Sequence, residues 1–190
     1  MAINTLYIDR GALKSASAIY NSQLPKNIRL EKFFQPSVFS LLQKKLFKSK
    51  YSSKFHPYKY RYSTTRLREV GSFLNGRYFD GIVRNMMNLA NYKCAYEIKK
   101  FEPGDYTLLH DSEKEKKGID FVLDFSESSE SYGGYTAYLT ESEEILQLSP
   151  SPNTLSFVER NKGVMRYVKY VQHKQKSPLV FVMGTLCMGR

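Results

Sequence analysis

The sequence is poor in cysteine and histidine and has no long hydrophobic run, with two cysteines and three histidines in 190 residues. The longest uninterrupted apolar stretch, residues 179–183, is far too short to cross a bilayer, so no transmembrane helix is predicted. Residues 1–14 lack the apolar core of a secretory signal, and we expect a cytoplasmic protein without membrane association. Cys94 and Cys187 have no His or Cys at ligand spacing, a pattern typical of reduced thiols rather than of disulfides or a zinc site.

Several catalytic motifs are also missing. The sequence contains no Walker phosphate-binding loop, no Gly-x-Gly-x-x-Gly fingerprint, no Gly-x-Ser-x-Gly elbow and no His-Glu-x-x-His motif. The acidic pair at Glu143 and Glu144 lies in a polar run and indicates loop charge rather than a general acid/base pair. Only His56, His110 and His173 could supply imidazole chemistry.

The composition nevertheless predicts one well-packed domain over residues 1–190, because 42% of the residues are apolar and 14% are aromatic. Residues 1–91 form a helical and basic amino-terminal part, with helices predicted at 34–48 and 77–91 from their apolar spacing. Residues 92–190 change to short β-branched and aromatic runs separated by Gly and Pro. The predicted strands are 96–101, 106–110, 119–125, 134–139, 154–158, 164–171 and 179–186. This order predicts an α+β fold with a sandwich or barrel and helices packed on one side.

Charge is the abnormal feature of the composition. The 29 Lys and Arg residues exceed the 18 Asp and Glu residues, which gives a net charge of +11 and makes polyanions plausible partners. Residues 32–68 contain ten basic residues and no acid, whereas residues 102–144 carry twelve of the eighteen acids. We therefore expect a dipolar molecule with one end able to attract phosphate.

The most distinctive segment, residues 44–68, interleaves nine Lys or Arg residues with aromatic residues that include Tyr51, Phe55, Tyr58, Tyr60 and Tyr62. Cations can bind phosphates, and aromatic faces can stack on unpaired bases. In a continuous strand, Tyr58, Tyr60 and Tyr62 would share one face and the cations the other, which would still leave a phosphate-binding edge. No signature of sequence-specific nucleic-acid recognition is present, and a merely solvated basic face is the alternative. The candidate nucleic-acid-binding residues are Lys54, Lys59, Arg61, Arg66 and Arg68.

Residues 101–110, FEPGDYTLLH, resemble the first core strands of the iron(II)- and 2-oxoglutarate-dependent oxygenases of the prolyl-hydroxylase type. In that family an aromatic-x-x-Gly-Asp segment leads to a metal-binding His-x-Asp. The pair Gly133–Gly134 is similar to the glycines that start a mid-barrel strand, and residues 150–157 and 166–171 are similar to the later "P-x-x-N-x-L-x-F" and "H-x-V-x-x-V" strands. The resemblance covers residues 96–186 and implies a double-stranded β-helix, a jelly-roll-like barrel, with the amino-terminal helices packed on one sheet.

The metal site implied by this resemblance is eroded. The family chemistry needs two imidazoles and one carboxylate on iron. His110 matches the first imidazole, but Ser112 stands at the carboxylate position and Arg166 at the second imidazole position. A neutral hydroxyl is a poor iron ligand, and a guanidinium cannot ligate a metal. Asp111 and His173 lie at odd offsets from these positions, so they would join a metal site only if the register slipped.

The resemblance also implies a place for an anion. Lys176 follows Arg166 by ten residues, where the prolyl-hydroxylase branch carries the lysine that binds the distal carboxylate of 2-oxoglutarate. Lys176 and Arg166 are therefore the candidate cofactor-binding residues. Inside the pocket that corresponds to the family's metal site, Arg166 could be neutralised by Asp111, Asp120 or Asp124, or could bind an anionic group of a ligand.

Three functional hypotheses follow. The leading one is a pseudoenzyme that binds neither iron(II) nor 2-oxoglutarate and serves as a basic binding module for RNA or a ribonucleoprotein. The second is an active iron(II)- and 2-oxoglutarate-dependent dioxygenase that hydroxylates a protein or nucleic-acid substrate, using His110, a carboxylate and His173. The third is a structural subunit whose basic face docks on an acidic protein partner.

Overall fold

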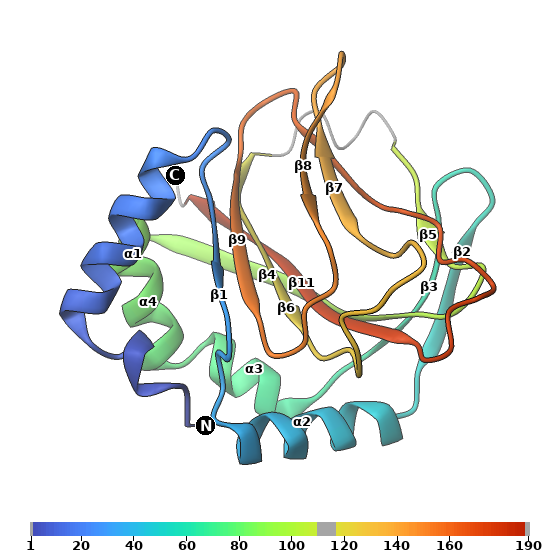
Figure 1. The fold of residues 1–190 in the computed structure, drawn as a ribbon, viewed down its shortest axis with the longest axis horizontal. Coiled ribbons are helices and arrows are strands. Elements are labelled where there is room, and N and C mark those ends of the chain that lie inside the picture. The colour runs from blue at the N-terminus through green and yellow to red at the C-terminus, as the bar shows by residue number, and fades with distance from the viewer. Residues whose placement is uncertain (1, 110–116, 189–190) are drawn as a thin grey trace.

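The computed structural model describes residues 2–109 and 117–188 (Figure 1). The amino-terminal part holds most of the helical structure, and antiparallel strands follow. The helices are η1 (Thr5–Tyr7), α1 (Arg10–Ser22), α2 (Pro36–Lys48), α3 (Arg68–Leu74) and α4 (Arg77–Met87). The strands are β1 (Asn27–Leu30), β2 (Ser52–His56), β3 (Tyr60–Thr65), β4 (Tyr92–Phe101), β5 (Tyr106–Thr107), β6 (Gly118–Asp124), β7 (Thr136–Leu139), β8 (Glu144–Leu148), β9 (Leu155–Arg160), β10 (Met165–Val168) and β11 (Leu179–Met188).

The two helices predicted from apolar spacing are confirmed as α2 and α4. Helix α2 begins with Pro36 in its first turn, where the missing N–H of proline costs nothing. Helix α4 ends earlier than predicted, because Asn88 adopts a left-handed conformation with φ of 53°. Helix α1 was not predicted, although Asp9 caps it by accepting a 2.8 Å hydrogen bond from the Ala12 N–H.

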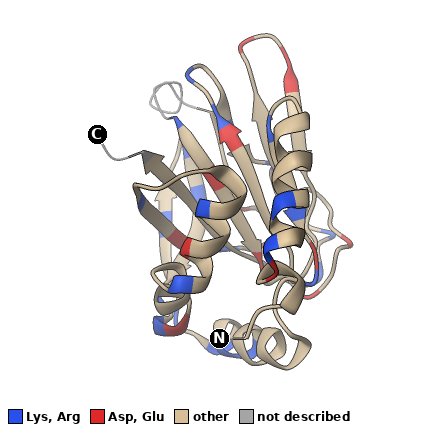
Figure 2. Ribbon diagram, turned by 90° about the vertical axis from the view of Figure 1, so that its left-hand side faces the viewer, with Lys and Arg blue, Asp and Glu red and all other residues tan. Residues whose placement is uncertain are grey.

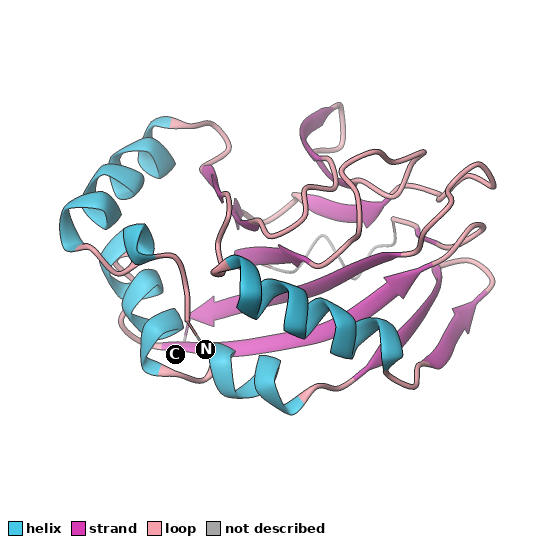
Figure 3. Cartoon of the chain, turned by 60° about the horizontal axis from the view of Figure 1, so that its bottom comes forward, coloured by secondary structure: helices cyan, strands magenta, loops and turns pink. Residues whose placement is uncertain are grey.

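The described strands form one curled sheet in which every pairing is antiparallel. The strand order is β1-β9-β6-β11-β4-β3-β5-β10-β7-β8, with β2 added to β3. Strand β3 pairs with β4 near Thr64 and with β5 near Tyr60, so it joins the two halves of the sheet. The result is a double-stranded β-helix half-barrel with helices outside, which confirms the predicted fold class (Figure 3).

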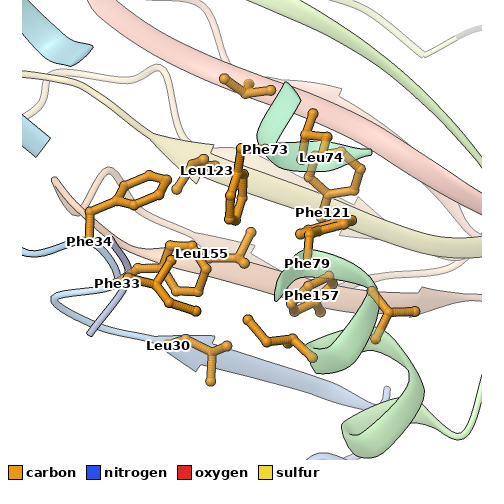
Figure 4. Packing of buried hydrophobic residues seen from close by; sticks show 14 of the residues in the cluster. Leu30, Phe33, Phe34, Phe73, Leu74, Phe79, Phe121, Leu123, Leu155 and Phe157 are labelled. Atoms are coloured by element: carbon orange, nitrogen blue, oxygen red, sulfur yellow. The ribbon is translucent and has the colours of Figure 1, made fainter. Parts of the chain in front are cut away.

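Residue alternation along β6 separates two apolar clusters. Phe121 and Leu123 join the larger cluster, which contains the buried helix residues, whereas Val122 joins the cluster inside the barrel. Figure 4 shows the phenylalanines of the larger cluster gathered between α3, α4 and the sheet. The ring of Phe79 lies 5.5 Å from Phe121 and 6.1 Å from Phe157, measured between centroids. These contacts fix the helices on the outer face and leave the inner face of the sheet for a site.

The paired glycines lie where the resemblance placed them, just before β7. Gly133 and Gly134 have φ of 83° and 69°, which side chains rarely adopt. A Cβ on Gly133 would approach the Tyr170 carbonyl oxygen to 2.0 Å. The pair therefore allows β7 to start against the loop that follows β10.

Two local predictions need correction. Glu144 was assigned to a loop, but it begins β8, which pairs with β7 through a register shift next to Leu139. Tyr58 was placed on a continuous strand with Tyr60, but residues 57–59 form the turn between β2 and β3.

Figure 2 shows acidic residues at the tip of the β7–β8 hairpin and lysines on α2 at the opposite end, in keeping with the expected dipole. Within the described residues, none of the helices has the length and apolar character needed to cross a membrane.

Candidate functional site

A buried ion cluster on the inner face of the barrel is formed by Asp120, Arg160 and Arg166. Asp120 on β6 is fully buried, and its two carboxylate oxygens meet two different guanidinium groups. The Arg160 Nη2 lies 3.2 Å from Asp120 Oδ1, and the Arg166 Nη1 lies 3.0 Å from Asp120 Oδ2. The Thr185 hydroxyl donates a hydrogen bond to Asp120 Oδ1 at 2.5 Å. Among the described residues, these contacts join two guanidinium groups and one hydroxyl to a single carboxylate.

Strand register explains how the chain brings these groups together. Asp120 is paired with Thr185 on β11 and with Val158 on β9, and Arg160 lies two residues beyond Val158, on the same inward side. Arg166 reaches the cluster from β10, on the opposite half of the barrel. Tyr138, the strand partner of Arg166, is fully buried beside them. Burial, followed by the charge of Asp120, raises the pKa of the Tyr138 phenol, so Tyr138 is neutral.

Arg166 thus points into the barrel and is neutralised by a carboxylate, as the sequence allowed. Asp120 provides that carboxylate. Asp124 lies elsewhere, because its oxygens accept hydrogen bonds from the backbone N–H groups of Ser126 and Ser151. Asp111 lies outside the described residues.

The described residues of this site do not fit an iron(II) centre. A facial triad needs imidazole and carboxylate donors with open lone pairs, whereas Arg166 is a permanent cation and Asp120 is held by two guanidinium groups. His110 and Ser112 lie outside the described residues. In residues 2–109 and 117–188, no three His, Cys, Asp or Glu side chains are grouped closely enough to hold a metal ion.

The remaining metal and cofactor candidates lie away from Arg166 on the surface. His173 is exposed in the loop between β10 and β11, where its Nε2 lies 3.1 Å from the Tyr170 hydroxyl. Lys176 is exposed in the same loop. Neither residue lines the cavity into which Arg166 faces.

That cavity, which we call the barrel-mouth cavity, has a volume of about 390 Å³. It is enclosed by β3, β4, β5, β10, β11 and the β2–β3 turn. Among the described residues, its charged lining is Lys59, Lys99, Arg166 and the carboxylate of Glu97, which lies 3.2 Å from the Lys99 ammonium. Its remaining walls are His56, Tyr60, Tyr62, Thr107, Leu108, Val168 and Met183. Among the described residues that line the cavity, cations therefore outnumber carboxylates.

The aromatic side of the cavity is a row of rings on the inner face of β2 and β3. Centroids of His56 and Tyr60 are 6.0 Å apart, and those of Tyr60 and Tyr62 are 5.3 Å apart. The Lys99 ammonium lies 4.2 Å from the centroid of Tyr62, a cation–π contact. Burial, then the charge of Glu97, raises the pKa of Tyr62, which keeps this phenol neutral.

A second hollow of about 730 Å³ continues along β2, β3 and β4 and shares Glu97 with the barrel-mouth cavity. Its cations are Lys50, Lys54 and Arg66, and Tyr96 forms part of its wall. We call the two hollows together the basic groove. The described residues that line it include six cations, three from each hollow, and one carboxylate, Glu97.

Of the predicted nucleic-acid-binding residues, Lys54, Lys59 and Arg66 line the basic groove. Arg61 points to the other face of β3, where its Nε lies 3.2 Å from Asp105 Oδ1. Arg68 begins α3 and lines a different hollow.

Sequence reasoning missed two cations of the site, Lys99 and Arg160. Both follow the alternation of a predicted strand, and that alternation is the signal that could have placed them on the inner face. Arg160 was missed because the predicted strand ended at Val158, two residues before the end of β9.

Comparisons with known proteins agree with the fold. Residues 50–186 match the family described as "Oxoglutarate and iron-dependent oxygenase degradation C-term". The chain is 36% identical to mouse prolyl 3-hydroxylase OGFOD1 over 85 residues and 34% identical to the Xenopus laevis protein over 91 residues. These alignments cover 43% and 44% of the chain but only 16% and 17% of the relatives' own length.

Solved structures of low sequence identity share the architecture. A Pseudomonas putida prolyl-4-hydroxylase superposes with a TM-score of 0.63 at 11% identity, covering 92% of this chain and 100% of that chain. A Trichoplax adhaerens prolyl hydroxylase, in complex with a hypoxia inducible factor peptide, gives a TM-score of 0.64 at 12% identity, covering 94% and 91%. These likenesses establish the fold.

Proposed function

The chain belongs to the oxoglutarate and iron-dependent oxygenase degradation C-term family, and we propose that it serves as a non-catalytic binding module for single-stranded RNA. The basic groove carries this proposal. Its cations can neutralise successive phosphates, while the half-buried rings of His56 and Tyr60 offer faces to unpaired bases. Protein side chains recognise single strands by this combination, without a dedicated sequence-reading motif.

The non-catalytic part of the proposal follows from the ion cluster. The family resemblance places Arg166 at the position of the second imidazole. Asp120, the described carboxylate that Arg166 contacts, is therefore already engaged by a cation. Fe(II) placed beside this guanidinium would be repelled. Titration with iron(II) and 2-oxoglutarate should therefore show no micromolar binding, and formation of succinate would overturn this part.

The RNA-binding part is tested by fluorescence anisotropy with a labelled ten-nucleotide single strand. Affinity should fall steeply with salt, because each neutralised phosphate of a single strand contributes a slope of about −0.7 in log K against log salt. The double variant Lys54→Gln and Arg66→Gln should bind at least about tenfold more weakly and should show a shallower slope. Lys44→Gln, an exposed cation on α2 outside the groove, is the matched control and should leave the affinity unchanged.

Two outcomes would overturn RNA binding. One is an equal loss of RNA affinity in the groove double variant and in the Lys44→Gln control, because the groove cations would then contribute no more to binding than a cation elsewhere on the surface. The other is tighter binding to polyglutamate than to RNA at equal salt, which would favour the acidic protein partner instead.

A further inference from the structure

A row of aromatic rings and one guanidinium group lies on the face of β3 opposite the basic groove. Phe55 on β2 is paired directly with Arg61 on β3, and Arg61 is paired directly with Tyr106 on β5, so these three side chains share one face. Beyond β5, the ring of Tyr170 stacks on Tyr106 with 6.5 Å between centroids. The Tyr170 hydroxyl lies 3.1 Å from the Nε2 of His173, which ends the row. We call these five residues the outer ladder.

The outer ladder presents its flat groups to solvent. Phe55 is 64% exposed, Tyr170 is 42% exposed and the side chain of Arg61 is 57% exposed. Single exposed apolar residues are common on protein surfaces, but a contiguous row of exposed rings is typical of an interaction site. Arg61 is also held in place, because its Nε lies 3.2 Å from the Oδ1 of Asp105, whose side chain is only 8% exposed. The guanidinium plane is therefore fixed and accessible at the same time.

The surroundings of the outer ladder indicate which partner it fits. Residues 161–190 contain no Asp or Glu. The loop after β10, which carries Tyr170 and His173, also carries three exposed lysines: Lys169, Lys174 and Lys176. Aromatic rings and guanidinium planes stack on unpaired bases, and lysines beside them can contact the phosphates of the same strand. This combination fits a single-stranded nucleic acid.

The free edge of β2 connects the outer ladder to the basic groove. Among the described strands, β2 pairs only with β3, and it lies at the rim of the sheet (Figure 1). Lys54, which lines the basic groove, and Phe55, which begins the outer ladder, are consecutive residues of β2 and therefore point to opposite faces. An RNA strand that crosses this edge passes directly from one surface to the other.

We infer that the outer ladder is a second RNA-contact surface, on which unpaired bases stack after the strand has crossed the edge of β2. The inference rests on the proposed function and narrows the class of RNA to single strands long enough to contact both faces of the β2–β3 hairpin. Neighbouring strands lie about 4.8 Å apart, so the row from Phe55 to Tyr170 spans about 14 Å. This length accommodates about four bases stacked about 3.4 Å apart.

Fluorescence anisotropy with a labelled twenty-nucleotide single strand tests the outer ladder. Phe55→Ala and Tyr170→Ala should each weaken binding at least about fivefold, because each removes a stacking surface. The salt dependence should stay unchanged, since neither variant removes a cation. Arg61→Lys keeps the charge but loses the planar group, and it should also weaken binding without changing the salt dependence. Tyr78→Ala, a 37% exposed tyrosine on α4 outside both surfaces, is the matched control and should bind as the parent chain does.

The outcomes separate the outer ladder from the basic groove. Weaker binding by the groove variant Lys54→Gln and Arg66→Gln, with unchanged binding by the ladder variants, would overturn the outer ladder and leave the proposed function standing. The reverse result would support the outer ladder and overturn the groove as the RNA site. No measurable binding of RNA would overturn both.

Two further measurements test the occupant. The same strand annealed to its complement has its base faces stacked within the duplex, so the parent chain and Phe55→Ala should bind it equally. A ladder variant that weakens duplex binding as much as single-strand binding would overturn the stacking of unpaired bases. Tighter binding of a proline-rich peptide than of the single strand would overturn RNA as the occupant, because aromatic surfaces also bind polyproline segments.

Discussion

Replacing Asp120 by asparagine should expose how much of the barrel depends on its buried ion cluster. The carboxylate lies 3.2 Å from Arg160 and 3.0 Å from Arg166, and the side chains of Asp120 and Arg160 are both fully buried. Asp120→Asn removes the negative charge and leaves two guanidinium groups in a site with little access to water. We therefore expect a large loss in the free energy of unfolding.

The magnitude follows from the burial. Removing one partner of a buried ion pair costs about 3–5 kcal/mol, because the remaining charge stays desolvated. Two cations share this carboxylate, so the cost should lie near the upper end, at about 5 kcal/mol. Glu159→Gln on the same strand as Arg160 is the control. Its carboxylate lies 3.7 Å from Lys26, both side chains are partly exposed, at 40% for Lys26 and 32% for Glu159, and the substitution should cost at most about 1 kcal/mol.

Urea denaturation monitored by circular dichroism measures the free energy of unfolding of both variants. A further substitution tests what causes the loss of stability. If the lost carboxylate charge produces the loss, adding Arg166→Met to Asp120→Asn should recover part of the stability, because one of the two cations that contact Asp120 is then removed as well. A loss below about 1 kcal/mol for Asp120→Asn, or a double variant less stable than the single one, would refute this reasoning.

Three further predictions concern the core, a buried acid and the thiols. Phe79→Ala should lower the free energy of unfolding by about 3–5 kcal/mol, because its fully buried ring packs on three other phenylalanines; a loss below about 1 kcal/mol in urea would contradict this packing. Burial raises the pKa of Asp124, so the folded chain holds this proton more tightly than the unfolded chain, and the stability of the parent minus that of Asp124→Asn should decrease from about pH 4 to pH 7. An increase across that window in paired urea titrations would contradict the raised pKa. Burial, then the neighbouring Cys187, raises the pKa of Cys94 to about 11, so iodoacetamide at about pH 8 should modify the exposed Cys187 first, as mass spectrometry of timed samples can establish.

Local patterns in the sequence were sufficient for much of the fold. The spacing of Val38, Leu41, Leu42 and Leu46 predicted α2, although Leu41 is exposed, and the β-branched runs after Lys93 predicted most barrel strands. These predictions were correct because each pattern reflects the burial of one face of a helix or strand. The family resemblance then indicated that these strands form a double-stranded β-helix, and the structure gives their order.

Strands held by distant partners could not be predicted in the same way. Strand β1 pairs with β9, so Ile28 meets Phe157 across a long sequence separation, and no local signal marks that contact. Strand β2 is exposed along almost its whole length and therefore lacks the apolar alternation of a buried strand.

The candidate site divides along the same line. The resemblance of residues 166–171 to a family strand marked Arg166, and the basic composition marked Lys54, Lys59 and Arg66. The contact of Arg166 with Asp120 was one of several alternatives, because choosing among them requires the register of β6 against β11 and the position of β10. Lys99 lines the barrel-mouth cavity together with residues of β3 because β4 pairs with β3, and this pairing is a tertiary contact that the local sequence does not show.

The position of β11 has a consequence for how the barrel acquires its structure. This strand pairs with β4 on one side and with β6 on the other, although both precede it by more than fifty residues. During synthesis, β4 and β6 must therefore emerge as open edges and wait for residues 179–188 to separate and pair them. Closure of such distant contacts is slow compared with helix formation, and we expect the nascent chain to be most prone to aggregation in that interval.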